Sequence, residues 1–247
     1  MSEKEILQIH LNSKDANIYH DNTTSNCEWF LPIIEVPQQH TIYISVQHAV
    51  IPYSMYNINS SNNLLKYQID NTYEYNLYIP GGNYNAYELM NFLKSNMNSI
   101  SNITYNTVTN KYIFLSNYDF IILKDSTCQK LLGLRNIDEV SINKSLTSYN
   151  CINLQSHHCI CIQSNLYTGS LNNTNKFENN VICSIPINNQ PYSMITYTNH
   201  NNLKYNLYKN TVSNIVLRLI DQNNDIIDLN GCHWSVSIQF EVIKFTD

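Results

Sequence analysis

The C-terminal segment, residues 226–246, contains a long and regular alternation of bulky apolar and polar residues. Such a period of two is typical of a strand with one buried face. A chain that ends in a strand of this kind places its end inside a sheet, and we therefore expect a β fold that closes late. The apolar positions are Trp234, Val236, Ile238, Phe240 and Val242, and the polar positions between them are Ser235, Ser237, Gln239 and Glu241.

Three further strands are predicted near the N-terminus, at Leu7–Leu11, Cys27–Val36 and His40–Ile51. The second of them contains Pro32, which has no N–H to give to a sheet ladder. A central strand would not tolerate it, so we predict either an edge strand or a strand with a break.

The middle of the chain, residues 64–147, has a different pattern and is predicted to be an inserted α+β subdomain. Ala86, Leu89, Met90, Leu93 and Met97 lie at helical spacing, and Asn85 with Glu88 resembles a capping box. The other predicted elements are a hairpin around Asp70–Thr72, strands at Ile103–Asn106, Lys111–Ser116 and Asp119–Leu123, and a short second helix at Ser126–Leu132 that Gly133 ends.

Strands resume after the insert. We expect them at Tyr149–Leu154, His158–Gln163 and Val181–Ile187, then a long polar connection with Met194–Tyr197 and Leu203–Tyr208, then the two closing strands, Ser213–Asp221 and Ile226–Thr246. Three strands before the insert and five after it give eight, the number in a jelly roll. The predicted fold class is all-β: an eight-stranded single jelly-roll sandwich from residues 1–63 and 148–247, with residues 64–147 inserted.

The amino-acid composition indicates which residues form the turns between strands. Roughly a sixth of the 247 residues are Asn, while Gly is present 5 times and Pro 6 times. Asn tolerates positive φ and closes local turns, so we expect it to replace Gly and Pro between strands. An A/T-rich coding sequence is an alternative origin of the Asn and Tyr content.

The charge pattern excludes several partners. The formal net charge is −5 with only 14 Lys and Arg, and they form no basic cluster, so we expect no direct contact with nucleic acid. No apolar stretch of 18 residues and no secretory leader are present, which predicts no membrane span and synthesis in the cytosol. The seven Cys are unpaired by spacing, as in a reducing compartment: Cys27, Cys128, Cys151, Cys159, Cys161, Cys183 and Cys232.

One segment could hold a metal. His157, Cys159 and Cys161 would project from one side of a strand, but a single strand does not surround a tetrahedral zinc ion. Buried thiols beside a surface histidine are the preferred interpretation, and we expect neither metal nor cofactor.

Catalytic patterns are also absent from the sequence. There is no Gly-x-Ser-x-Gly elbow, Gly81–Gly82 fits no phosphate-binding motif, and four histidines have no patterned partner: His10, His20, His40 and His48. The acidic pairs Asp138–Glu139 and Asp225 with Asp228 are typical of solvated turns. We expect no catalytic, cofactor-binding or metal-binding residue, and we expect the protein not to be an enzyme.

An ordered set of segments resembles the penton, or vertex, capsid proteins of virophages and of related Polinton-like and large DNA viruses. The segments are Ile9–Tyr19, Val46–Asn59, Tyr78–Met97, Leu131–Leu134, Asn179–Asn199 and Val216–Val242.

The resemblance implies a structural viral protein of single jelly-roll type, in the virion and made in the host cytoplasm. It implies a homopentamer at the fivefold vertices of an icosahedral capsid, beside a double-jelly-roll major capsid protein and minor capsid proteins. Three alternatives stay open: a minor capsid protein, a carbohydrate-binding jelly roll that recognises a host glycan through Tyr residues of the insert, and a hydrolase with an unrecognised site.

Overall fold

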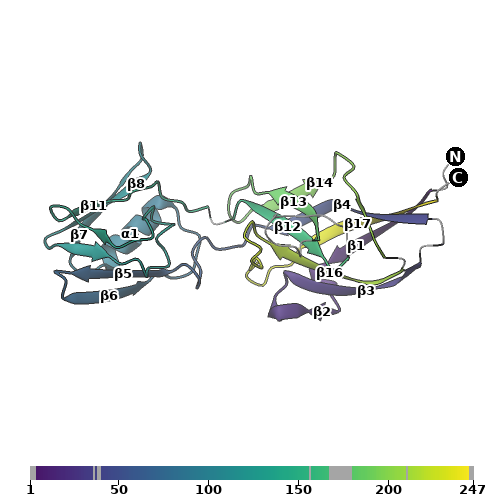
Figure 1. Cartoon of the computed structure of the whole chain (residues 1–247), viewed down its shortest axis with the longest axis horizontal. Helices are drawn as coiled ribbons and strands as arrows, with labels where there is room; N and C mark the ends of the chain where they lie inside the picture. The colour runs from purple at the N-terminus through teal and green to yellow at the C-terminus, as the bar shows by residue number, and fades with distance from the viewer. Residues whose placement is uncertain are drawn as a thin grey trace. The chain divides into compact units, whose positions relative to one another are not determined.

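The computed structural model of the chain describes residues 4–35, 37, 40–155, 157–166, 180–209 and 211–244. These residues form two compact units (Figure 1). The first contains the described residues up to Met55 and from His157 onward, and the second contains those between Tyr56 and Ser156. The chain thus leaves the first unit and later returns to it.

Two antiparallel sheets build the first unit. Sheet A has the order β1-β17-β4-β14, with β15 also paired to β4, and sheet B has the order β13-β12-β16-β3-β2. Sheet A consists of β1 (Lys4–Asn12), β4 (His40–Pro52), β14 (Met194–Thr198), β15 (Tyr205–Asn206) and β17 (Ser235–Lys244). Sheet B consists of β2 (Ile18–Tyr19), β3 (Asn26–Glu35), β12 (Cys159–Ser164), β13 (Val181–Pro186) and β16 (Thr211–Ile220). Two 3-10 turns, η1 (Ser13–Asp15) and η2 (His20–Asn22), flank β2.

The chain alternates between these sheets in the manner of a jelly roll. Apart from the two-residue strands β2 and β15, it runs through β1 in sheet A, β3 in sheet B, β4 in sheet A, β12 and β13 in sheet B, β14 in sheet A, β16 in sheet B and β17 in sheet A. Four strands in each sheet make eight, and the predicted all-β jelly-roll class is confirmed. The second unit connects β4 to β12.

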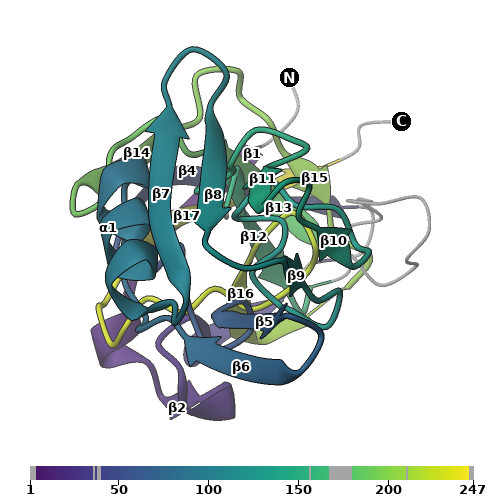
Figure 2. The ribbon, with the colours of Figure 1, turned by 90° about the vertical axis from the view of Figure 1, so that its left-hand side faces the viewer.

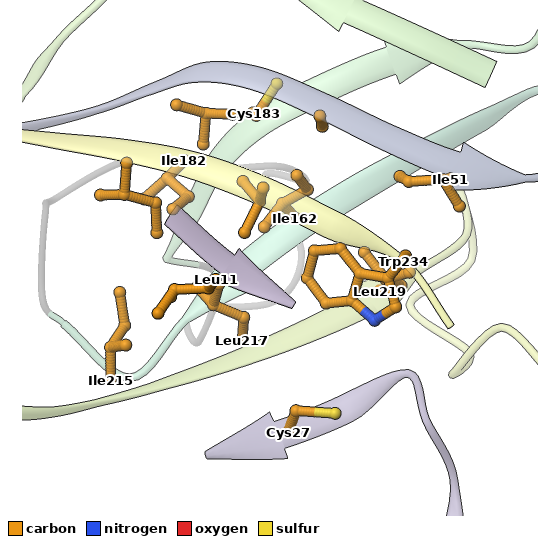
Figure 3. Close-up of a cluster of buried hydrophobic side chains, with 14 of the residues drawn as sticks. Leu11, Cys27, Ile51, Ile162, Ile182, Cys183, Ile215, Leu217, Leu219 and Trp234 are labelled. Atoms are coloured by element: carbon orange, nitrogen blue, oxygen red, sulfur yellow. The ribbon is translucent and has the colours of Figure 1, made fainter. Parts of the chain in front are cut away.

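The inner faces of sheets A and B share one apolar core. Figure 3 shows part of it, with Leu11 from β1, Ile51 from β4, Ile162 from β12 and Leu217 from β16 in one cluster. Every strand of the eight contributes at least one buried residue to this core, so the sandwich depends on both chain ends.

The closing strand β17 lies inside sheet A, as its alternation predicts, but it begins at Ser235 and not at the predicted Ile226, because residues 227–234 form turns and loops. It pairs with β1 on one side and β4 on the other. Val236, Ile238 and Phe240 are buried in the core. Glu241 departs from the pattern, because it is buried although it lies on the outer face.

Pro32 lies in an irregularity of β3. Val212 pairs with Ile34 and Asn214 pairs with Phe30, so the three residues from Leu31 to Ile33 oppose a single residue of β16. A bulge of this kind accommodates a residue without an N–H. The predicted break in this strand is therefore confirmed.

The second unit has two small antiparallel sheets and one α-helix. α1 (Ala86–Asn96) lies against β7 (Figure 2), and its buried Leu89 and Leu93 belong to the same core as Ile103 of β7 and Phe114 of β8. One sheet has the order β10-β9-β5-β6, from β5 (Leu64–Ile69), β6 (Tyr73–Tyr78), β9 (Phe120–Ile122) and β10 (Glu139–Val140). The other has the order β11-β8-β7, from β7 (Ile100–Asn106), β8 (Lys111–Ser116) and β11 (Ser145–Thr147).

The start of α1 follows the predicted capping box. The Asn85 side chain accepts hydrogen bonds from the N–H groups of Tyr87 and Glu88, and the Glu88 carboxylate accepts one from the Asn85 N–H at 2.8 Å. These bonds satisfy backbone donors that the first helical turn leaves unpaired.

Asn does form many of the turns. Among the described non-glycine residues, 12 have positive φ, and seven of these are Asn: Asn22, Asn71, Asn110, Asn143, Asn202, Asn224 and Asn230. The Asp70–Thr72 hairpin is confirmed, with Asp70 and Asn71 both at positive φ. The short polar side chain of Asn allows this left-handed conformation at low cost.

Three predictions about local structure were wrong. The expected strand at Tyr149–Leu154 is irregular, whereas Met194–Thr198, expected within a polar connection, forms β14. Tyr149–Leu154 alternates, but its backbone binds turn segments such as Gly133 and Leu131 and forms no ladder with a strand. The expected helix at Ser126–Leu132 is a series of turns. Gly133 is the last residue of these turns, and its φ is +69°.

Candidate functional site

An exposed apolar strip lies on the outer face of sheet B, and we name it the β2–β3 strip. Phe30 is 60% exposed, Ile33 is 67% exposed and Ile18 is 39% exposed. Phe30 projects away from the core because Trp29 and Leu31 project into it. The bulge at Pro32 puts Ile34 on the core side, so that Ile33 shares the outer face with Phe30.

A polar cluster stands beside this strip. The Glu28 carboxylate accepts a hydrogen bond from Asn214 Nδ2 at 2.7 Å, and His20 Nε2 lies 3.0 Å from its other oxygen. The pKa of Glu28 is lowered because the Asn214 hydrogen bond, helped by His20, outweighs the effect of burial. Since Ile18 pairs directly with Glu28, the carboxylate is held at the base of the β2–β3 strip.

Four side chains form a row across the outer face of sheet A. His10 pairs with Ser237, Ser237 with His48, and His48 with Thr198 in the strand ladders. His10 Nδ1 is 2.7 Å from Ser237 Oγ, and His48 Nδ1 is 3.3 Å from Thr198 Oγ1. This row borders a pocket of about 320 Å³.

The four histidines without a sequence partner do not form a catalytic set. His10 contacts a serine hydroxyl, but no carboxylate is bonded to its ring among the described residues. His20 contacts Glu28, His48 contacts Thr198, and His40 pairs with Lys244 in the β4–β17 ladder. None of His10, His20 and His48 therefore combines a nucleophile with an orienting acid among the described residues.

The His157–Cys161 segment brings two of its three ligand candidates close together. Cys159 Sγ and Cys161 Sγ are 3.9 Å apart, but His157 Nδ1 lies 3.6 Å from a carboxylate oxygen of Asp221. The pKa of Asp221 is lowered: burial raises it, and the contacts with His157, Asp225 and Asn223 outweigh that effect. Within residues 4–244, wherever the structure describes them, no three His, Cys, Asp or Glu side chains are placed to hold a metal ion.

The two acidic pairs differ from each other. Asp225 and Asp228 are exposed in turns, as predicted. The solvated-turn prediction is wrong for Glu139, which is buried and forms two 2.8 Å hydrogen bonds with the Arg135 guanidinium. The Arg135 hydrogen bonds lower the pKa of Glu139 against the opposing effect of burial. This carboxylate is fully engaged in a structural ion pair.

The remaining predicted features have structural roles. Gly82 exchanges two backbone hydrogen bonds with Ile58, which places the Gly81–Gly82 turn in a bridge between segments. No helix among the described residues has the length and apolar character needed to cross a membrane.

Sequence reasoning missed both surface features. The β2–β3 strip depends on the bulge at Pro32, and the row on sheet A joins residues as distant as His10 and Ser237. Only the alternation of each strand gave a signal, since it showed which residues face outward. It did not show which strands lie side by side.

Comparisons with known proteins identify the fold. No protein-family model matches the sequence, and no curated protein matches it. The crystal structure of the mavirus penton protein superposes with a TM-score of 0.51 at 11% identity, covering 97% of this chain and 99% of that chain. A structure from the Sputnik virophage gives a TM-score of 0.43 at 13% identity, covering 98% of both chains. The resemblance predicted from the sequence is confirmed at the level of the fold: this chain shares the fold of the mavirus penton protein over nearly its whole length.

Proposed function

We propose that this chain is a structural capsid protein of a virophage or related DNA virus and forms the pentameric penton at the fivefold vertices of an icosahedral shell. The observation that carries the proposal is the end-to-end match with the mavirus penton protein, which includes the jelly roll and the insert together. A match limited to the sandwich would be shared by many unrelated jelly rolls, whereas the shared insertion is more specific.

The surface of the first unit supports ring assembly. A closed ring uses a heterologous interface, in which one patch meets a different patch on the next copy. The β2–β3 strip supplies a rigid apolar patch, because β3 is paired with β16, β2 is paired with β3, and its base carries the bonded Glu28. Exposed apolar area of this kind marks interaction surfaces, and we assign it to contact with the neighbouring copy in the ring.

The proposed partners are other copies of this chain, a double-jelly-roll major capsid protein and minor capsid proteins, in a virion assembled after synthesis in the host cytoplasm. The net charge of −5 supports a role without direct genome binding. The separated histidines and the engaged carboxylates support a role without catalysis. A minor capsid protein at another position of the shell is the second candidate, because the same fold could be used there.

Native mass spectrometry of the purified protein and a reconstruction of the assembled particle test this proposal. We expect a five-copy species in solution and density for this fold at the fivefold vertices. A strict monomer that is absent from the vertices would overturn the vertex assignment. Density elsewhere in the shell would favour the minor capsid role.

We also propose that the insert is a domain of its own, with strands that begin at Leu64 and end at Thr147. It has a separate apolar core and its own helix, which supports independent stability. Limited proteolysis of the full chain should cut near Met55 and His157 and release a resistant fragment between them. Prior cleavage within the insert would contradict this.

A further inference from the structure

The pocket on sheet A is a second surface feature of the first unit, and its lining contains none of the β2–β3 strip residues Ile18, Phe30 and Ile33. Its lining includes the polar residues His10, Asn12, Asp15, His48, Ser235 and Ser237. The remaining lining residues are Val50 and four members of the apolar core, Leu11, Trp29, Ala49 and Val236. Its volume of about 320 Å³ is near the lower limit of small-molecule sites. The lining strands β1, β17 and β4 are hydrogen-bonded to one another, so the pocket is formed before any ligand arrives.

Several polar groups in the lining are available to a ligand. The bonds to Ser237 and Thr198 use the Nδ1 atoms of His10 and His48, and neither Nε2 atom is bonded to a residue in the described part of the chain. Among the residues that the structure describes, Ser235 Oγ and the Asp15 carboxylate also have no hydrogen-bonding partner. The pocket therefore presents hydroxyl and imidazole groups, which both donate and accept, beside one strong acceptor.

The charge and polarity of the lining disfavour three classes of ligand. An anion would meet the Asp15 carboxylate, and none of the lining residues is Lys or Arg. A metal ion would lack a set of three ligands within the described residues. An apolar molecule would desolvate the hydroxyls and imidazoles without replacing their hydrogen bonds, which is unfavourable.

From this geometry we infer that the pocket binds one neutral sugar residue of a glycan. Each sugar hydroxyl both donates and accepts a hydrogen bond, which matches the mixture of Asp15, Ser235 and the two imidazoles. Val50, 38% exposed, gives the C–H face of the ring an apolar contact. The inference extends beyond the capsid role, and it places sugar recognition on the jelly roll and not on the Tyr residues of the insert.

Saturation-transfer NMR on the full-length protein tests the inference, with the methyl glycosides of glucose, galactose, mannose, fucose and N-acetylglucosamine as probes. We expect at least one to bind with a Kd of about 1 mM or tighter, a range typical of single small ligands with few contacts. Asp15→Ala should remove an acceptor and Ser235→Phe should fill the pocket, and each should weaken binding by about tenfold or more. Raising the salt concentration should leave the affinity of a neutral sugar unchanged.

Matched controls separate the pocket from the rest of the surface. Asp225→Ala changes an exposed acid of the same unit, and Ser213→Phe adds a ring on sheet B. Both should bind the glycosides as the unmodified protein does. Tyr73→Ala, at an exposed site of the insert, should also be neutral.

Three results would overturn the inference: no binding of any glycoside, unchanged binding by both pocket variants, or loss of binding in Tyr73→Ala alone. Binding restricted to sulfated sugars and abolished by salt would show an anion site and would also overturn it. The oligomeric state is measured separately by native mass spectrometry, so a failure of ring assembly and a failure of sugar binding are distinguishable.

Discussion

The indole rings of Trp29 and Trp234 pack edge to face, with centroids 6.2 Å apart and ring planes at 86°. Trp29 belongs to β3 of sheet B, and Trp234 directly precedes β17 of sheet A. Both indole N–H groups are bonded, Trp29 to the Asn12 carbonyl at 3.1 Å and Trp234 to the Thr24 carbonyl at 2.8 Å. The pair therefore joins the two sheets and satisfies its own polar atoms inside the core.

Trp234→Ala should lower the free energy of unfolding of the first unit by about 3 to 5 kcal/mol, because it removes a large buried ring and leaves a cavity. Trp234→Phe should cost less, since most of the apolar volume remains. Urea denaturation followed by circular dichroism measures both. Val108→Ala, at a side chain 93% exposed, is the control and should be neutral. An equal effect of the two alanine changes would contradict the role of Trp234.

Glu241 should make stability depend on pH. Its carboxylate lies 2.8 Å from Lys4 Nζ and 3.0 Å from Lys204 Nζ. Burial raises the pKa of Glu241, and the hydrogen bonds from Lys4 and Lys204 outweigh this, so its pKa is below the usual 4.5. A lowered folded-state pKa contributes stability above pH 4.5, and this contribution is lost as the pH falls through the folded-state value.

Glu241→Gln should therefore reduce stability at pH 7 and flatten its decline below pH 4.5. Denaturant midpoints at pH 7, 5, 4 and 3 measure the effect. Glu74→Gln, an exposed acid of β6, is the control and should keep the unmodified pH profile. Parallel pH profiles for Glu241→Gln and the unmodified protein would refute the assignment.

Gly133 should be far less tolerant of substitution than Gly231. Both have positive φ, +69° and +75°. A Cβ at Gly133 would lie 2.3 Å from the Asn150 carbonyl oxygen, whereas a Cβ at Gly231 would meet nothing within 4 Å. Gly231→Ala should cost about 1 kcal/mol from backbone strain alone. Gly133→Ala should cost about 2 kcal/mol or more, because the backbone of Asn150 and Cys151 must also move.

Amide hydrogen exchange measures how much each glycine substitution destabilises the unit that contains it. Faster exchange in residues 56–155 is expected for Gly133→Ala and not for Gly231→Ala. If residues 56–155 were equally protected from exchange in both variants, the backbone around Gly133 would accommodate a Cβ without destabilising the unit.

Charges placed on the β2–β3 strip should prevent ring assembly without unfolding the chain. Phe30→Asp and Ile33→Asp replace side chains 60% and 67% exposed, so the core is untouched. A buried unpaired carboxylate at an interface is strongly unfavourable, and native mass spectrometry should show monomers. Val108→Asp makes the same chemical change in the insert and should leave the pentamer intact. A pentamer formed by both strip variants would place the ring contact elsewhere.

Local sequence signals worked best where neighbouring residues settle the structure. The capping box of Asn85 and Glu88 was visible because its partners are three residues apart. The apolar face of β17 was visible because alternation sets it directly. The same type of signal failed at Ser126–Leu132, where hydrogen bonds to Leu64 and a turn at Gly133 replace a regular helix.

The candidate surfaces could not be predicted in the same way. Glu241 alternates like an exposed residue, yet Lys4 and Lys204 reach it from 237 and 37 positions away and cover it. The pocket on sheet A needs β1, β17 and β4 side by side, and no local pattern specifies that order. The exposed position of Ile33 required the bulge opposite β16.

The amino-acid sequence by itself determined the strand faces, the helix cap and the use of Asn in turns, because each depends on a period or on contacts between near neighbours. Only the tertiary structure decided which strands pair, that Glu241 is buried and where the pocket forms. These features join residues that are distant in the chain. Their contacts form, and stabilise the protein, only when the two sheets of the sandwich have come together.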